Sequence, residues 1–292
     1  MNILTFDIEE WYVEKVWGGN SQSRYKQFDE LLDLLLAELE RRNTKATFFC
    51  LGQIAKEFSY VIRKIQDRGH EIGCHSHEHF WLNKMTREMA MEDTRHAVDA
   101  LEQCIGKKVL SYRAPAFSIG KKNNWAFEIL KDCGIKRDAS VFPAVRDFGG
   151  FPEFSSKSPV VVYFEGGAIK EFPICTTKLL GKEIAYSGGG YFRFFPLSYI
   201  RKEMAKSDYS MTYFHIGDLV QEVSGMLSKA EYENYFKEKG TFSKRAIRYV
   251  KTNLGKKNAV NKLIKLIASE DFVSLEQADS MIDWQTVTPL VL

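Results

Sequence analysis

Three features that would place this chain outside the ordinary globular enzymes are missing from its sequence. No apolar run approaches the roughly 18 residues that a membrane span needs, and no internal repeat or low-complexity tract is present. The start of the chain runs directly into acidic residues, without the basic and apolar segments of a signal peptide. These absences predict a cytoplasmic protein with no transmembrane segment.

Paired cysteines and a strong charge are also lacking. The five cysteines form no C-x-x-C pair and their odd number cannot be fully paired, which favours a reducing compartment. The 41 basic and 38 acidic residues leave a net charge of only +3, so the composition gives no reason to propose nucleic acid as a partner. The basic stretch 244–265 is interpreted as a solvated helix face, with a weak membrane-surface contact as the alternative.

Short β-like runs alternate with longer helical patterns over the first 140 residues. Such alternation predicts an α/β fold with a mostly parallel sheet or barrel, in which catalytic groups collect at the carboxyl ends of the strands. The strands are expected at 2–6, 46–51, 71–74, 109–112, 211–216 and 272–275, and the helices at 28–41, 54–68, 86–105, 125–133, 196–205, 242–254 and 260–268. We expect one domain over 1–292, with an irregular insertion at 142–195 that contains short strands such as 160–164, and a C-terminal helical extension at 240–292.

Reactive side chains follow four of these strands. Asp7, Glu9 and Glu10 come after the first strand, and His75 and His79 come after the strand at 71–74. Arg113 follows the strand at 109–112, and His215 lies near the end of the strand at 211–216. Taken singly, each group is more often structural; together they predict one site at one edge of the sheet.

The spacing of His75 and His79 allows both rings to lie on one side of a single helical turn and bind one metal ion. With a carboxylate they form a set of two histidines and one carboxylate, which leaves coordination positions open for water and substrate. Such a set suits zinc, cobalt, iron or nickel, and zinc is expected because of its availability.

The motifs Thr5-Phe6-Asp7, His75-Ser76-x-x-His79 and Arg113-x-Pro115, followed by a late His215, resemble those of the polysaccharide deacetylase family, the NodB homology domain of carbohydrate esterase family four. The resemblance covers roughly residues 1–220. It implies a distorted (β/α) barrel of about seven strands and a metal-dependent hydrolase that removes an N-acetyl group from an amino sugar.

The resemblance also implies roles for particular residues. Asp7 matches the general base, Arg113 the arginine that orients it, and His215 the general acid. His75 and His79 match the metal ligands, and the backbone N–H of Ala116 matches the oxyanion contact.

Two departures from the common pattern concern carboxylates. Ile8 stands where the common motif has a second aspartate, so the metal ligand is expected to be Glu9, with Glu10 as the alternative, because alternate residues of a strand share a face. A variant branch of the family, with allantoinase-like members, has its acids at a similar spacing. The family's aspartate–tryptophan pair is not evident, although Asp138 occupies a similar place.

Four residues are candidate substrate contacts: Trp11, Phe117, Tyr191 and Arg193. Aromatic faces suit sugar rings, and an arginine would suit an anionic substrate such as a lipid- or nucleotide-linked sugar. The expected substrate is an acetylated amino sugar of a polysaccharide or glycoconjugate precursor. Two alternatives stay open: a hydrolase of a small amide, as in the allantoinase-like branch, and a carbohydrate-binding protein without catalysis.

Overall fold

The computed structural model describes residues 1–146, 148–221, 225–236 and 238–292. Its main element is a nine-stranded sheet in the order β12-β2-β3-β4-β5-β6-β8-β7-β14. The strands, in that order, are Phe214–His215, Thr5–Ile8, Thr47–Cys50, Glu71–Cys74, Ser111–Tyr112, Arg137–Asp138, Gly167–Glu171, Val160–Phe164 and Leu290–Val291.

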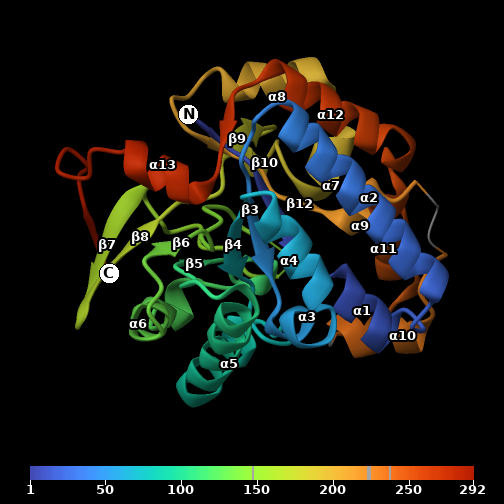
Figure 1. Cartoon of the computed structure of the whole chain (residues 1–292), viewed down its shortest axis with the longest axis horizontal. Helices are drawn as coiled ribbons and strands as arrows, with labels where there is room; N and C mark the ends of the chain where they lie inside the picture. The colour runs from blue at the N-terminus through green and yellow to red at the C-terminus, as the bar shows by residue number, and fades with distance from the viewer. Residues whose placement is uncertain (147, 222–224, 237) are drawn as a thin grey trace.

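The seven strands from β12 to β8 are all parallel to their neighbours, which places their carboxyl ends at one edge. The two outer strands differ, since β7 runs antiparallel to β8. The curved sheet occupies the middle of the molecule and helices cover its outside (Figure 1). This arrangement confirms the predicted α/β fold and its parallel core of about seven strands.

A small second sheet continues the amino-terminal ends of the main one. It consists of β11, β1 and β13, which are Ser210–Met211, Asn2–Ile3 and Phe272–Val273. Strand β11 contacts the segment after β8 through hydrogen bonds that involve side chains, not through strand pairing. The backbone N–H of Met211 donates to Cys175 Sγ at 3.2 Å. The hydroxyl of Tyr209 donates to the carbonyl of Pro173 at 2.7 Å. The barrel is distorted because, in the described residues, no strand pairing joins β11 to the segment after β8.

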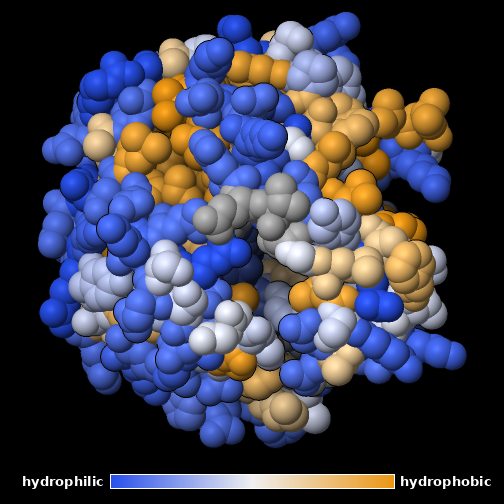
Figure 2. Space-filling model, turned by 90° about the vertical axis from the view of Figure 1, so that its right-hand side faces the viewer, coloured by the Kyte–Doolittle hydropathy of each residue, from blue (hydrophilic) through white to orange (hydrophobic). Residues whose placement is uncertain are grey.

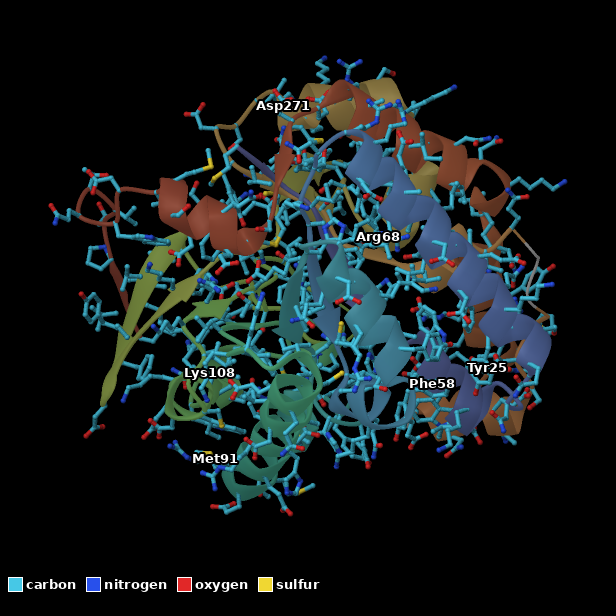
Figure 3. The ribbon with its side chains drawn as sticks, in the orientation of Figure 1. Tyr25, Phe58, Arg68, Met91, Lys108 and Asp271 are labelled. Atoms are coloured by element: carbon cyan, nitrogen blue, oxygen red, sulfur yellow. The ribbon has the colours of Figure 1, made fainter. Side chains whose placement is uncertain are left out.

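Helix forms in each of the seven expected ranges, and the described residues also contain five α-helices that the sequence did not predict. The long helices are α2 (Gln22–Arg41), α5 (Arg87–Ile105), α11 (Phe242–Asn253) and α12 (Ala259–Ser269). The shorter ones are α1 (Glu10–Trp17), α3 (Gly52–Glu57), α4 (Ser59–Asp67), α6 (Ala126–Asp132), α7 (Gly189–Phe194), α8 (Leu197–Met204), α9 (Ile216–Leu219), α10 (Lys229–Phe236) and α13 (Leu275–Met281). The helix expected at 54–68 is two helices that meet at Phe58, whose ring packs on Tyr25 of α2 at 5.3 Å (Figure 3). None of the described helices has the length and apolar character that a membrane crossing requires.

Two expectations about the second half of the chain need correction. The segment 142–195 contains the expected strand 160–164 as β7, but it is more regular than expected, because it also contains β8, the hairpin of β9 (Thr176–Leu179) and β10 (Lys182–Ala185), and α7. The segment 240–292 is not only helical, because β13 pairs with β1 and β14 pairs with β7. One hydrophobic cluster extends from Ile3 to Ala278, which supports a single domain.

Candidate active site

The acidic residues of the site come from the end of strand β2. Thr5 and Asp7 lie on one face of this buried strand, and Glu9 follows directly before α1. Asp7 is almost fully buried, with 2% of its surface exposed. Glu10 turns elsewhere: its carboxylate accepts a hydrogen bond from the backbone N–H of Gly217 at 2.6 Å. Glu9, and not Glu10, is therefore the carboxylate that faces the histidines.

The segment 75–79 leaves the end of β4 as an irregular loop, so the expected single helical turn is wrong. Ser76 and His79 both have left-handed backbone conformations, with φ of 72° and 63°, which reverse the chain within five residues. Asp93 of α5 fixes the loop by accepting a hydrogen bond from the backbone N–H of His77 at 3.1 Å. The two rings still converge, with His75 and His79 centroids 5.5 Å apart.

Glu9, His75 and His79 form a candidate metal centre. One ligand atom from each lies within 4.8 Å of the other two. The Glu9 Oε2 atom is 2.6 Å from His79 Nε2 and 3.7 Å from His75 Nε2. Spacings of this size suit three ligands that surround one small divalent cation.

The hydrogen bonds of these residues support this assignment. His75 Nδ1 lies 2.7 Å from the carbonyl oxygen of Arg113, and a carbonyl only accepts, so Nδ1 carries the proton. The neutral ring then presents the lone pair of Nε2 toward Glu9. Glu9 Oε2 is buried and has no hydrogen bond of normal geometry among the described residues, although His79 Nε2 lies 2.6 Å away. Two electron-rich atoms that face one another in a buried place fit a bound cation.

Arg113 connects the metal centre to the predicted base. Its fully buried guanidinium donates to Asp7 Oδ1 at 2.8 Å, to Thr5 Oγ1 at 2.7 Å and to the carbonyl of Ala139 at 3.2 Å. The backbone carbonyl of Arg113 also accepts a hydrogen bond from His75. Arg113 therefore positions both the predicted base, Asp7, and the candidate metal ligand His75. Asp7 is thereby held with its second oxygen toward the mouth of the site.

His215 lies on β12 directly opposite Asp7 of β2. Its Nε2 atom is 3.7 Å from Asp7 Oδ2 and 3.8 Å from Glu9 Oε1. Burial alone would lower the pKa of His215, but the carboxylates of Glu9 and Asp218 raise it well above its usual value. A protonated imidazole therefore lies beside a carboxylate base, as general acid and base catalysis requires.

Asp218 holds the other side of this imidazole and was missed in the sequence. Its Oδ2 accepts from His215 Nδ1 at 3.1 Å, and its Oδ1 pairs with Arg193 Nη1 at 2.8 Å. Burial would raise the pKa of Asp218, whereas His215 and Arg193 lower it, so the group stays ionised. The sequence signal that could have identified Asp218 is its position three residues after His215, in the first turn of a short helix.

Two parts of the chain are similar to known protein families. Residues 3–137 match the family model described as polysaccharide deacetylase. This part of the chain is therefore similar to the polysaccharide deacetylases. Residues 139–279 match a second model, described as a domain of unknown function (DUF3473).

Curated relatives align only with part of this chain. The peptidoglycan-N-acetylglucosamine deacetylase of Bacillus cereus is 33% identical over 95 residues, which are 31% of this chain and 32% of the relative. The uncharacterized protein YlxY of Bacillus subtilis is 30% identical over 121 residues, which are 39% of this chain and 38% of the relative. The chain thus spans about a third of the length of these relatives.

A solved structure covers the whole chain. It is that of a protein from Mycobacterium smegmatis provisionally named a polysaccharide deacetylase, with a TM-score of 0.65 and 16% identity, covering 100% of this chain and 92% of that one. At this identity the likeness shows the fold alone. The fold shared with that protein therefore includes both halves of this chain.

Within the candidate active site, Ala116 occupies a tight turn after β5. It has a φ of 56° in the segment Pro115–Phe117. Gly149 packs directly on the turn, since a Cβ at Gly149 would lie 2.5 Å from the Ala116 carbonyl oxygen and 2.4 Å from that of Phe117. The turn is held in place by this close approach, and the role of the Ala116 N–H stays a prediction.

Three of the four expected substrate contacts need correction. Trp11 is fully buried and packs edge-on against Phe28, and Phe117 is 4% exposed and packs against Tyr213. Arg193 pairs with Asp218 and is therefore already neutralised inside the protein. The sheet and its helices enclose these three side chains, which therefore serve in packing and positioning and not in contacting substrate. Tyr191 is partly exposed on α7, at 37%, and remains a candidate.

Helix α10 packs against helix α1, which begins directly after Glu9, and the sequence did not indicate this contact. Burial first, and then the charge of Glu9, raise the pKa of Tyr235 on α10. The Tyr235 ring packs edge-on against Trp17 of α1 at 5.3 Å, and Trp17 packs against Tyr12. The second half of the chain thus forms an aromatic border beside the site.

Proposed function

We propose that this protein is a divalent-metal-dependent hydrolase that removes an N-acetyl group from an amino sugar. The observation that carries the proposal is the placing of Asp7 and His215 beside the Glu9, His75 and His79 centre, with His215 Nε2 3.7 Å from Asp7 Oδ2. A site for binding alone has no need of an ionised acid and a protonated imidazole at adjoining positions. Amide hydrolysis needs both.

We propose zinc as the cation, because two imidazole nitrogens and one carboxylate form an open set that suits it. When bound, such an ion polarises the amide carbonyl and lowers the pKa of water. Glu9 then shares its charge with the ion, so Asp218 becomes the carboxylate that keeps His215 protonated.

The side chains carry the proton transfers. Asp7, held by Arg113 and Thr5, accepts a proton from the water that attacks the acetyl carbon. The backbone N–H of Ala116 is the proposed donor to the developing oxyanion. His215 donates its proton to the sugar nitrogen as the carbon–nitrogen bond breaks, which leaves acetate and a free amine.

The proposed substrate is an acetylated sugar of a polysaccharide or of its precursor. The deacetylases among the relatives support the reaction class, as the Bacillus cereus relative is named for acting on peptidoglycan N-acetylglucosamine. All five cysteines are free thiols, which supports work in a reducing compartment such as the cytoplasm and hence on a precursor.

Acetate release from a panel of acetylated sugars tests this proposal. The wild type, loaded in turn with zinc, cobalt and nickel, is compared with His75→Ala, and His96→Ala, on the exposed side of α5, is the matched control. We expect acetate from the wild type and from His96→Ala, and none from His75→Ala. Ammonia or urea-type products would instead indicate a small-amide hydrolase, and sugar binding without any product would indicate a binding protein.

A further inference from the structure

Helix α11 presents its hydrophobic side to solvent, the reverse of an ordinary surface helix. Not one of its residues is buried, and the exposed fractions of Phe242, Ile247 and Val250 are 68%, 56% and 56%. Two of its cationic residues contact neighbouring segments: Arg245 donates to the carbonyl of Leu227 at 3.0 Å, and Arg248 lies 4.6 Å from the ring of Phe236.

The hydrophobic surface continues onto the neighbouring helix α7. Phe194 is 61% exposed, and Arg193 beside it donates to the carbonyl of Lys251 in α11 at 2.9 Å. The docking face is defined by five exposed apolar residues: Phe194, Phe242, Ile247, Val250 and Leu254. Exposed apolar side chains gather on this side of the molecule in Figure 2, which faces the helices at the right of Figure 1. Clustered exposure of this kind marks a contact surface.

Positive charge is concentrated around the same face. Residues 242–265 contain eight lysines and arginines and no aspartate or glutamate. The rest of the chain has 33 basic against 38 acidic residues and is net negative. The basic character of the protein is therefore local, and it coincides with the docking face.

We propose that the docking face binds the surface of an anionic lipid bilayer. Apolar side chains on one face of a helix with cations beside them match the boundary between acyl chains and anionic headgroups. A second copy fits less well, because a two-fold contact would bring the two clusters of cations together. Nucleic acid would account for the cations but not for the exposed Phe242, Ile247 and Val250.

The docking face lies beside the candidate active site. Arg248 of α11 contacts Phe236 of α10, and the adjacent Tyr235 packs on Trp17 of α1, the helix that begins directly after Glu9. A bilayer on the docking face would thus bring lipid-anchored saccharides close to the site. This consequence rests on the proposed function, whereas the binding of lipid does not.

Co-sedimentation with vesicles tests the proposal without any activity measurement. We expect the full chain to sediment with vesicles containing phosphatidylglycerol, at least tenfold more than with phosphatidylcholine alone, and to be released by salt. Ile247→Ser/Val250→Ser should lower this binding at least tenfold, and Lys251→Gln/Lys257→Gln should lower it severalfold. Leu180→Ser/Val291→Ser is the matched control, because it removes two apolar side chains that are even more exposed but lie outside the docking face, and it should leave binding unchanged.

Three results would overturn the proposal. The first is a wild type that stays in solution with phosphatidylglycerol vesicles. The second is equal sedimentation of Ile247→Ser/Val250→Ser, which would assign the surface to polyanions in general. The third is a lipid-free dimer, measured by light scattering, that the same two substitutions dissociate, which would make the face a contact between copies. Acetate release in solution by a protein that does not bind vesicles would leave the proposed function standing.

Discussion

Both ends of the parallel sheet contain buried charged side chains. In the described residues the charges at the amino-terminal end are paired with one another, whereas those at the carboxyl end could also bind a ligand. At the amino-terminal end, Arg137 donates to Ser111 at 2.8 Å and pairs with Glu71 at 3.3 Å and Asp279 at 3.2 Å. Glu71 in turn accepts from the hydroxyl of Thr47 and from the backbone N–H of Glu276. Each charge in this network is matched within the protein.

At the carboxyl end, Glu9 Oε2 has no hydrogen bond of normal geometry among the described residues, and the lone pair of His75 Nε2 points toward it. A matched network stabilises a fold, whereas buried groups that face each other unmatched indicate a place for a ligand. The comparison therefore predicts that changes at one end alter stability and changes at the other alter activity.

The largest expected effect is at the carboxyl end. Asp7→Asn should lower the rate of acetate release by about 10²–10⁴, because the base is lost. Asparagine keeps an oxygen for Arg113 but removes its buried counter-charge, so the rate is compared per folded molecule. Glu71→Gln, at the other end, is the matched control and should keep the wild-type rate. Unchanged turnover in Asp7→Asn would remove Asp7 from its role as the base.

At the amino-terminal end, Arg137→Met should lower the free energy of unfolding by about 3–5 kcal/mol, because it leaves Glu71 and Asp279 without their buried cation. Urea unfolding measures the loss, and turnover per folded molecule should remain. If activity fell while stability held, the division of roles between the two ends would be wrong.

Cation binding should stabilise the wild type through the carboxyl end alone. Zinc at a hundred times its dissociation constant is expected to raise the free energy of unfolding by about 2.7 kcal/mol over the protein with a chelator. His75→Ala should gain little, and Arg137→Met should gain as much as the wild type. Equal gains in wild type and His75→Ala would show that the ion binds elsewhere.

The last expected effect concerns a buried acid pair behind Arg113. Burial raises the pKa of Asp138 to about 6, and burial together with Asp138 raises the pKa of Glu171 well above its usual value. The folded protein thus retains protons that the unfolded chain releases near pH 4, so the contribution of this pair to stability is greatest in acid and is lost as the pH rises toward 6 and above. The slope should reach about 1.4 kcal/mol per pH unit for each proton, and Glu171→Gln should flatten it in urea unfolding from pH 5 to 8.

The sequence predicted the parallel core and the grouping of Asp7, Glu9, His75, His79, Arg113 and His215, because both depend on local patterns. Strands show as short apolar runs, and parallel strands bring the residues at their ends to one edge. The strand 71–74 was predicted at its observed bounds.

Features that depend on distant packing were not predictable in this way. Nothing local tells that Trp11 and Phe117 are enclosed, since that depends on helices far along the chain. The loop 75–79 was read as a helical turn because spacing alone does not reveal the left-handed Ser76 and His79. The aromatic border from α10 depends on how the second half of the chain folds back over the first.

The pairing of β12 with β2 has one more consequence. Asp7 and His215 are register partners on neighbouring parallel strands, so the backbone ladder itself sets their separation at the width of one strand spacing. A one-residue insertion between Ser210 and His215 would turn the imidazole to the opposite face of the sheet. This stretch of chain should therefore accept changes of side chain far more readily than changes of length.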